Sequence, residues 1–227
     1  MGLTLEDFAN RHAGADVYVF GSGPSLNHID PAFFDGKITV SANHGCLRVL
    51  GSVDYLVTKY HRHAWEYAEW WPTTPTITTR HDTGVFTQAR LGDDVPFTVV
   101  EHNDNTCDRW TPDQWPTTGL VATWSTITTA MHFAAHLGAA NIIMVAHDLG
   151  HIDEAGRVPG YRQDADGVAD DSGDAPMWEG FDRQSRAVKA ELLHRYDGLR
   201  NVVSLLPFIN ANFEGHSWTS FAGRINA

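Results

Sequence analysis

A glycine-rich turn directly after the apolar run at residues 16–20 is the feature of this sequence with the clearest chemistry. Its residues are Gly21, Ser22, Gly23, Pro24 and Ser25. Glycine lets the backbone approach a bulky ligand, and proline is tolerated in the first turn of a helix. Backbone N–H groups at the start of a helix lack partners within it, and the helix dipole favours an anion there. The turn therefore predicts a phosphate-binding site.

This turn departs from two well-known phosphate-binding patterns. Leu26 stands where the dinucleotide-binding fingerprint needs a third glycine, and the Gly-Lys-Ser/Thr sequence of a P-loop does not follow. The alternative interpretation is a tight strand-to-helix turn without a ligand. The preceding strand and the Pro24-Ser25 pair favour phosphate binding.

A second group of candidate residues follows the apolar run at 141–146. Asp148 could bind a divalent metal or a ligand hydroxyl. His151 could act as a general base, because the ordinary pKa of histidine lies near neutrality. The alternative is that Asp148 caps the following turn and that His151 is solvated.

The segment 60–71 is rich in aromatic residues and histidines, and we expect it in an excursion between strands. Trp65, Trp70 and Trp71 could stack on a base or a sugar, although burial in a core is the commoner use of tryptophan. The histidines of this segment, together with His81, lack a recognised metal-ligand spacing. A structural role is the favoured interpretation.

Alternating strand and helix patterns must position these residues. Helical patterns cover residues 122–137 and 179–196, and apolar strand patterns cover residues 16–20, 37–43, 53–58, 76–79, 97–100, 141–146 and 201–206. This alternation predicts an α/β, Rossmann-like fold with a mostly parallel sheet and helices on both faces. We expect a single domain over residues 1–227, with a mobile acidic loop at 150–176.

Composition narrows the classes of partner. The chain has 227 residues, a formal net charge of −12 and two cysteines, Cys46 and Cys107. Because this charge repels polyanions, nucleic acid is disfavoured as a partner. No apolar run approaches the roughly 20 residues of a membrane span, and residues 1–7 lack the features of a signal peptide. We expect a cytoplasmic, reduced protein without a membrane span, and its oligomeric state is left open.

Four short stretches of the chain fit one known pattern. They are residues 21–26 (GSGPSL), residues 41–43 (SAN), the helix that opens at Ser125 with the strand and loop up to residue 149, and residues 205–210 (LLPFIN). Together they resemble the bacterial family-42 sialyltransferases and, equally, the archaeal 6-hydroxymethylpterin diphosphokinase-like proteins. The first and third stretches are the specific ones.

The resemblance implies a Rossmann-like fold of the glycosyltransferase-A variant type, with a nucleotide over the carboxyl ends of the strands. Asn43, with the glycine turn, would hold phosphate and ribose or base, and Ser125 would contribute from a helix N-terminus. Tyr161 falls near a tyrosine that assists phosphate departure in the sialyltransferases. The chain departs from that pattern at Ala146, where the family has glycine, and at residues 178–182, which lack the catalytic histidine of the sialyltransferases.

The leading hypothesis is a nucleotide-sugar-dependent, glycosyltransferase-like enzyme. Its donor would be a CMP-sugar or another NDP-sugar, its catalytic residues Asp148, His151 and Tyr161, and Mg²⁺ could bind at Asp148. The acceptor is not indicated by the sequence. Two alternatives stay open: an ATP-dependent diphosphokinase that acts on a pterin-like alcohol, and a nucleotide-binding relative without catalysis.

Overall fold

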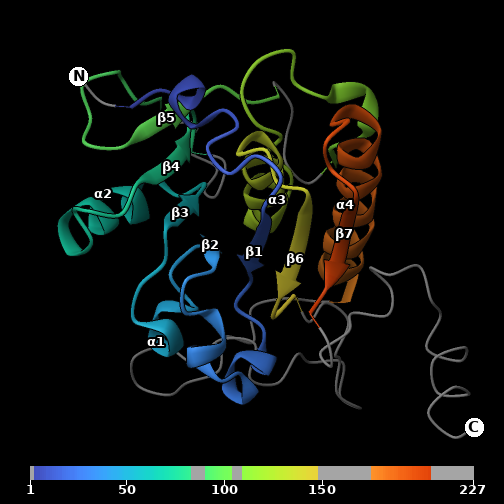
Figure 1. Ribbon diagram of the computed structural model, residues 1–227. Coiled ribbons are helices and arrows are strands. Elements are labelled where there is room, and N and C mark those ends of the chain that lie inside the picture. The colour runs from blue at the N-terminus through green and yellow to red at the C-terminus, as the bar shows by residue number, and fades with distance from the viewer. Residues whose placement is uncertain (1–2, 83–89, 104–108, 148–174, 206–227) are drawn as a thin grey trace, which may run out of the picture.

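A parallel seven-stranded sheet forms the centre of the described part of the chain (Figure 1). The computed structural model describes residues 3–82, 90–103, 109–147 and 175–205. The strand order across the sheet is β5-β4-β3-β2-β1-β6-β7. The strands are β1 (Asp16–Phe20), β2 (Ile38–Ala42), β3 (Tyr55–Thr58), β4 (Thr76–Thr79), β5 (Thr98–Val100), β6 (Asn141–Val145) and β7 (Asn201–Ser204). The predicted Rossmann-like α/β fold is confirmed.

The order of the strands creates a switch point between β1 and β6. From β1 the chain moves outward through β2, β3, β4 and β5, and it then crosses to the other side of β1 to form β6 and β7. Connections therefore leave this pair of strands in opposite directions. In open parallel sheets, ligands bind in the crevice outside the carboxyl ends of the strands at such a point. We call the side of the sheet where its strands end the carboxyl edge.

Helical segments cover both faces of the sheet. The α-helices are α1 (Leu47–Leu50), α2 (His61–Trp70), α3 (Thr126–His136) and α4 (Ala175–Arg195), and the 3₁₀-helices include η2 (Pro24–His28), η3 (Pro31–Phe34) and η5 (Pro112–Gln114). Val17 and Val19 of β1 point into the core beneath α3 and α4. Tyr18 and Phe20 point to the opposite face, where η2, η3, α1 and α2 pack. This alternation is the two-residue period of a strand buried on both faces.

The central helix α3 is almost completely enclosed. Its residues from Thr126 to Ala135 are all buried, so its hydrophobic surface is continuous rather than a stripe. Ser125 caps the N-terminus, and Gly138 ends the helix with a φ of 85° that an L side chain rarely adopts. The predicted helix at 122–137 is therefore present but begins four residues later.

Two local predictions were wrong in detail. The segment 60–71 lies between strands as predicted, but its helical form was not predicted: residues His61–Trp70 form α2, which packs on β3 and β4 and buries Ala64 and Tyr67. The helix after the glycine turn is only the five-residue 3₁₀-helix η2. The second long helix begins at Ala175, and residues 148–174, most of the predicted acidic loop, lie outside the described residues.

Among the residues that the structure describes, no helix is both long enough and apolar enough to cross a bilayer.

A buried histidine in the core makes stability depend on pH. His132 is buried, and its Nδ1 accepts a hydrogen bond from the Val121 N–H at 2.8 Å. Its Nε2 therefore carries the proton and donates it to the Tyr196 hydroxyl at 2.8 Å. Burial, aided by the charges of His136 and Arg195, lowers the pKa of His132 to about 3.

We expect the free energy of unfolding to fall on acidification. His132 binds a proton in the unfolded chain as the pH falls, whereas its low pKa keeps it neutral in the native protein. From about pH 7.5 to about pH 5, this one group should cost about 2 kcal/mol. Denaturant unfolding across that range measures the loss. His132→Gln should flatten the pH dependence, whereas His194→Gln, a change at an exposed position, should leave it as in the parent. An unchanged slope in His132→Gln would contradict the assignment.

Candidate functional site

The ends of β1 and β6 are held together by their backbones at the switch point. The Gly21 N–H donates to the Val145 carbonyl at 2.8 Å, and the Gly23 N–H donates to the Ala146 carbonyl at 3.0 Å. A Cβ at Gly21 would lie 2.5 Å from the Ala146 oxygen, closer than real Cβ contacts come. Gly21 is therefore required for this close approach. The amides of Gly21 and Gly23 cannot also bind phosphate, which corrects the expectation that the whole turn would do so.

The remaining polar groups of the turn belong to serines. Ser22 and Ser25 are both half-buried, and Pro24 is the first residue of η2. Gly45, in the loop after β2, lies against Ser22, and a Cβ there would collide with the Ser22 side chain. A ligand at this turn would therefore meet Ser22 and Ser25 rather than a ring of free glycine amides.

Two non-glycine residues beside the turn have left-handed backbone conformations. Asn43 follows β2 with a φ of 60°, and Ala146 follows β6 with a φ of 53°. This region costs an ordinary L residue about 1–2 kcal/mol and concentrates at functional sites. The strands on either side of β1 are therefore both followed by a left-handed residue.

The Asn43 side chain is held in one orientation. The Thr58 hydroxyl donates to Asn43 Oδ1 at 2.9 Å, and the Asn43 N–H donates to the Val57 carbonyl at 2.8 Å. The Ser41 hydroxyl donates to the Asn43 carbonyl. Because Thr58 holds the amide by its oxygen, the NH₂ group is left to donate to a ligand. A fixed donor of this kind suits recognition of a base or a ribose hydroxyl.

A buried lysine anchors the segment that leads into α3. Lys59 follows β3 and is only 1% exposed. Its Nζ donates to the carbonyl oxygens of Thr123 and Trp124, the latter at 2.8 Å. Asn103, which follows β5, holds the same segment, because its side chain exchanges two hydrogen bonds with the backbone of Ala122. Sequence reasoning missed Lys59, although a lysine directly after a buried strand is an available signal.

Ser125 brings the α3 N-terminus to the carboxyl edge. Its side chain accepts from the Ile127 N–H at 3.5 Å, a long bond, and its carbonyl accepts from the Thr128 hydroxyl at 2.8 Å. The dipole of α3 is positive at this end. The Lys59 ammonium is bound to the carbonyl groups of the two residues before Ser125. The helix dipole and the Lys59 ammonium thus both contribute positive potential near this end of α3, in a chain whose formal net charge is −12.

Aromatic rings and histidines gather beside Asn43. A hydrogen bond of 2.9 Å joins His44 Nδ1 to the Tyr67 hydroxyl. The ring of His63 stacks on that of Tyr67, with 5.8 Å between centroids, and lies 5.0 Å from that of Tyr60. Tyr67 is buried, and the other three rings are partly exposed. These partly exposed rings could contact a flat ligand, a role that sequence analysis did not assign to them.

The histidines considered for a metal have separate contacts. His61 Nε2 lies 3.0 Å from the Thr79 carbonyl, and His81 Nδ1 lies 3.3 Å from His102 Nε2. Across residues 3–82, 90–103, 109–147 and 175–205, no three His, Cys, Asp or Glu side chains are grouped as a metal site.

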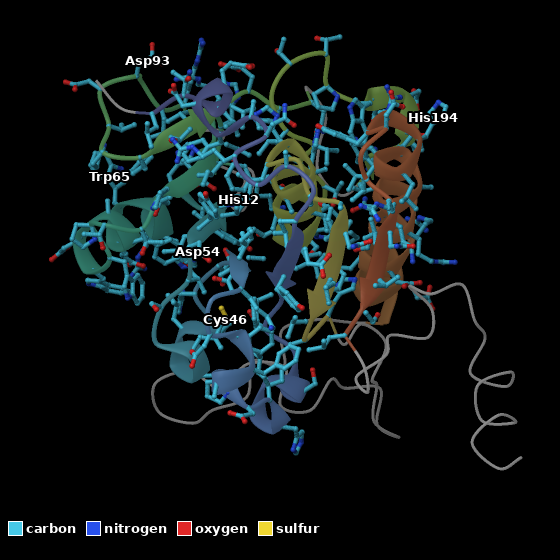
Figure 2. All side chains as sticks on the ribbon, viewed as in Figure 1. His12, Cys46, Asp54, Trp65, Asp93 and His194 are labelled. Carbon is cyan, nitrogen blue, oxygen red and sulfur yellow. The ribbon has the colours of Figure 1, made fainter. Side chains whose placement is uncertain are left out.

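The tryptophans of α2 lie away from the switch point. Trp65 and Trp70 are about half exposed, and Trp65 packs against Phe97 ahead of β5. Figure 2 shows Trp65 at α2, well away from β1 and β6. An open groove of 540 Å³ runs along this side and is lined by Arg62, Trp65, Glu66, Ala68, Glu69 and Pro96. It is separate from the carboxyl edge.

The predicted catalytic residues Asp148, His151 and Tyr161 lie outside the described residues and stay predictions. The chain is described as far as His147, which is buried after β6. Burial and the nearby charge of Lys189 lower the pKa of His147 to about 3. His147 is therefore neutral at physiological pH.

No protein-family model matches the chain, and no curated protein or solved structure is significantly similar to it. The resemblance to the family-42 sialyltransferases and the pterin diphosphokinase-like proteins therefore stays a prediction.

Gly21→Ala should lower the free energy of unfolding by about 1–3 kcal/mol, because the added methyl overpacks the junction of β1 and β6. Gly92→Ala is the matched control, since a Cβ there meets nothing within 4 Å. It should change stability by less than about 0.5 kcal/mol. Denaturant unfolding of both variants gives the comparison, and equal stabilities would show that the close approach at Gly21 is not required.

Proposed function

We propose that this protein is a nucleotide-dependent transferase of the glycosyltransferase type, whose donor is a nucleotide-activated sugar bound across the carboxyl ends of β1 and β6. The main support is the backbone geometry at the switch point, where a close approach at Gly21 lies between two left-handed residues. Asn43, Gly21 and Ala146 end three neighbouring strands, and two of them are held in left-handed conformations. Strain persists where the surrounding structure enforces it, and ligand sites are the usual setting.

The charge distribution supports a phosphate at this site. The α3 N-terminus, capped by Ser125 and anchored by Lys59, supplies positive potential, and Ser22 and Ser25 supply hydroxyl groups. Helix N-termini and hydroxyl groups stabilise a departing phosphate oxygen as negative charge develops on it. These groups take over the role first expected of the amides of Gly21 and Gly23.

Asn43 and the neighbouring rings support recognition of the nucleoside. The fixed amide of Asn43 can donate to a base or ribose oxygen, and the partly exposed rings of His44, Tyr60 and His63 lie beside it. Aromatic faces stack on every base, so they add affinity with little base selectivity. Donors of the CMP, UDP and GDP classes are therefore all in scope.

The chemical step is assigned to residues after β6. Asp148 would bind Mg²⁺ or an acceptor hydroxyl, His151 would act as general base, and Tyr161 would assist phosphate departure. This assignment keeps the roles that the sequence and the resemblance indicate.

Thermal-shift titration of the protein against CMP-, UDP- and GDP-sugars tests the proposal. At a ligand concentration about 100-fold above its Kd, stabilisation should reach about 2.7 kcal/mol. ATP with and without Mg²⁺ forms a second arm, since stabilisation by Mg²⁺-ATP alone would indicate the diphosphokinase alternative. The absence of stabilisation by every nucleotide would refute a nucleotide site.

Asn43→Gly should weaken nucleotide binding about tenfold, because it removes one directed hydrogen bond to the ligand. Glycine adopts the left-handed backbone without strain, so the loop conformation should survive. Asn10→Gly is the matched control, because Asn10 has nearly the same φ, 57°, but is exposed and bonds to the far end of α3 through His136. Calorimetric titration compares the two Kd values. Equal Kd values in the two variants would show that the Asn43 side chain does not bind the nucleotide.

A further inference from the structure

The first half of α4 lies at the carboxyl edge, next to the start of α3. The helix connects β6 to the parallel neighbouring strand β7, so it begins at the edge where β6 ends (Figure 1). The Trp124 N–H donates to Gln184 Oε1 at 2.9 Å, and the ring of Phe181 packs edge-on against Trp124 with 5.5 Å between centroids. A Cβ at Gly180 would lie 2.9 Å from the Trp124 ring. One side of α4 is thus fastened beside Ser125.

A second side of α4 carries polar residues into the protein. Asp182, Ser185 and Lys189 follow the three- and seven-residue spacing of one helical face. The hydrogen bond between Trp124 and Gln184 places this stretch of α4 beside the start of α3, at the carboxyl edge. Asp182 is 9% exposed and Ser185 is fully buried.

Two atoms on this face lack hydrogen-bond partners. In the part of the chain that the structure describes, Asp182 Oδ1 and Ser185 Oγ are buried and make no hydrogen bond. The other carboxylate oxygen, Oδ2, pairs with the Arg186 guanidinium at 3.1 Å. An unpaired buried polar group destabilises the fold. Thr76, Thr78, Trp110 and Thr129 also carry such atoms, but Asp182 and Ser185 place two of them on adjacent turns of one helix beside the carboxyl edge.

We propose that Asp182 and Ser185 bind hydroxyl groups of the sugar carried by the nucleotide donor. The inference rests on the proposed function and extends it from the nucleotide to the transferred group.

The chemistry of the two groups selects a hydroxylated ligand. A carboxylate oxygen needs a donor and repels phosphate, and a serine hydroxyl can both donate and accept. A hydroxyl group meets both requirements, and phosphate meets only the second. Side chains three residues apart on a helix have Cβ atoms about 5–6 Å apart, so neighbouring hydroxyls of one sugar ring can reach both.

The test compares two affinities in each protein: that for the free nucleotide and that for the nucleotide-sugar which stabilises the parent protein most. Ser185→Ala should leave the Kd of the nucleotide unchanged and raise that of the nucleotide-sugar about tenfold, the worth of one directed hydrogen bond. Asp182→Asn should act in the same direction. Arg183→Gln is the control, because Arg183 is exposed on the same helix.

Stability separates a ligand-binding role from a structural one. Because Ser185 Oγ is unpaired, Ser185→Ala should keep or raise the melting temperature of the unliganded protein while it weakens sugar binding. A clear fall in melting temperature would overturn the inference, since it would mean that the hydroxyl is paired within the fold.

The remaining outcomes keep the two proposals apart. The parent could bind nucleotides while the ratio of the two Kd values, for nucleotide and nucleotide-sugar, is the same in the parent, Ser185→Ala and Asp182→Asn. That result would overturn the inference but not the proposed nucleotide site. Failure of the parent to bind any nucleotide or nucleotide-sugar would overturn the proposed function itself and the inference with it.

Discussion

The backbone contact between the ends of β1 and β6 is the constraint on which the candidate site depends. Gly21 and Gly23 donate to consecutive carbonyl groups at the end of β6, and only a residue without a Cβ fits at Gly21. This contact joins the ends of β1 and β6 directly, and it occupies the two glycine amides. It leaves ligand recognition to side chains and to the α3 N-terminus. The site is therefore assembled from several strand ends rather than from one loop.

Two kinds of local cost are present at the carboxyl edge of the sheet. Asn43 and Ala146 have left-handed backbones, and α4 adds two buried atoms without partners. A third left-handed residue, Asn10, lies at the amino edge, where its N–H donates to the His136 carbonyl at the end of α3. Proteins tolerate such local costs where function requires them, so their presence at the carboxyl edge agrees with a binding role there.

Local sequence patterns were sufficient for the sheet and insufficient for the site. The apolar runs of β1 and β6 identify buried parallel strands because burial on both faces leaves a near-continuous pattern. The start of α3 was misjudged because the carbonyls of Thr123 and Trp124 are bound by Lys59, a contact across more than 60 residues. The glycine turn was located correctly, but its amides are occupied by a strand about 120 residues later. Pairings of such long range leave no mark in a local pattern.

The burial of Lys59 also gives the molecule an internal reporter. The chain contains three lysines, Lys37, Lys59 and Lys189. Lys59 is only 1% exposed, with its ammonium bound to the carbonyls that precede α3, whereas the other two side chains are partly exposed. An amine-directed reagent can reach Lys59 only when that junction opens. The rate at which this one residue is labelled therefore measures how often the junction of β3 and α3 comes apart in the native protein.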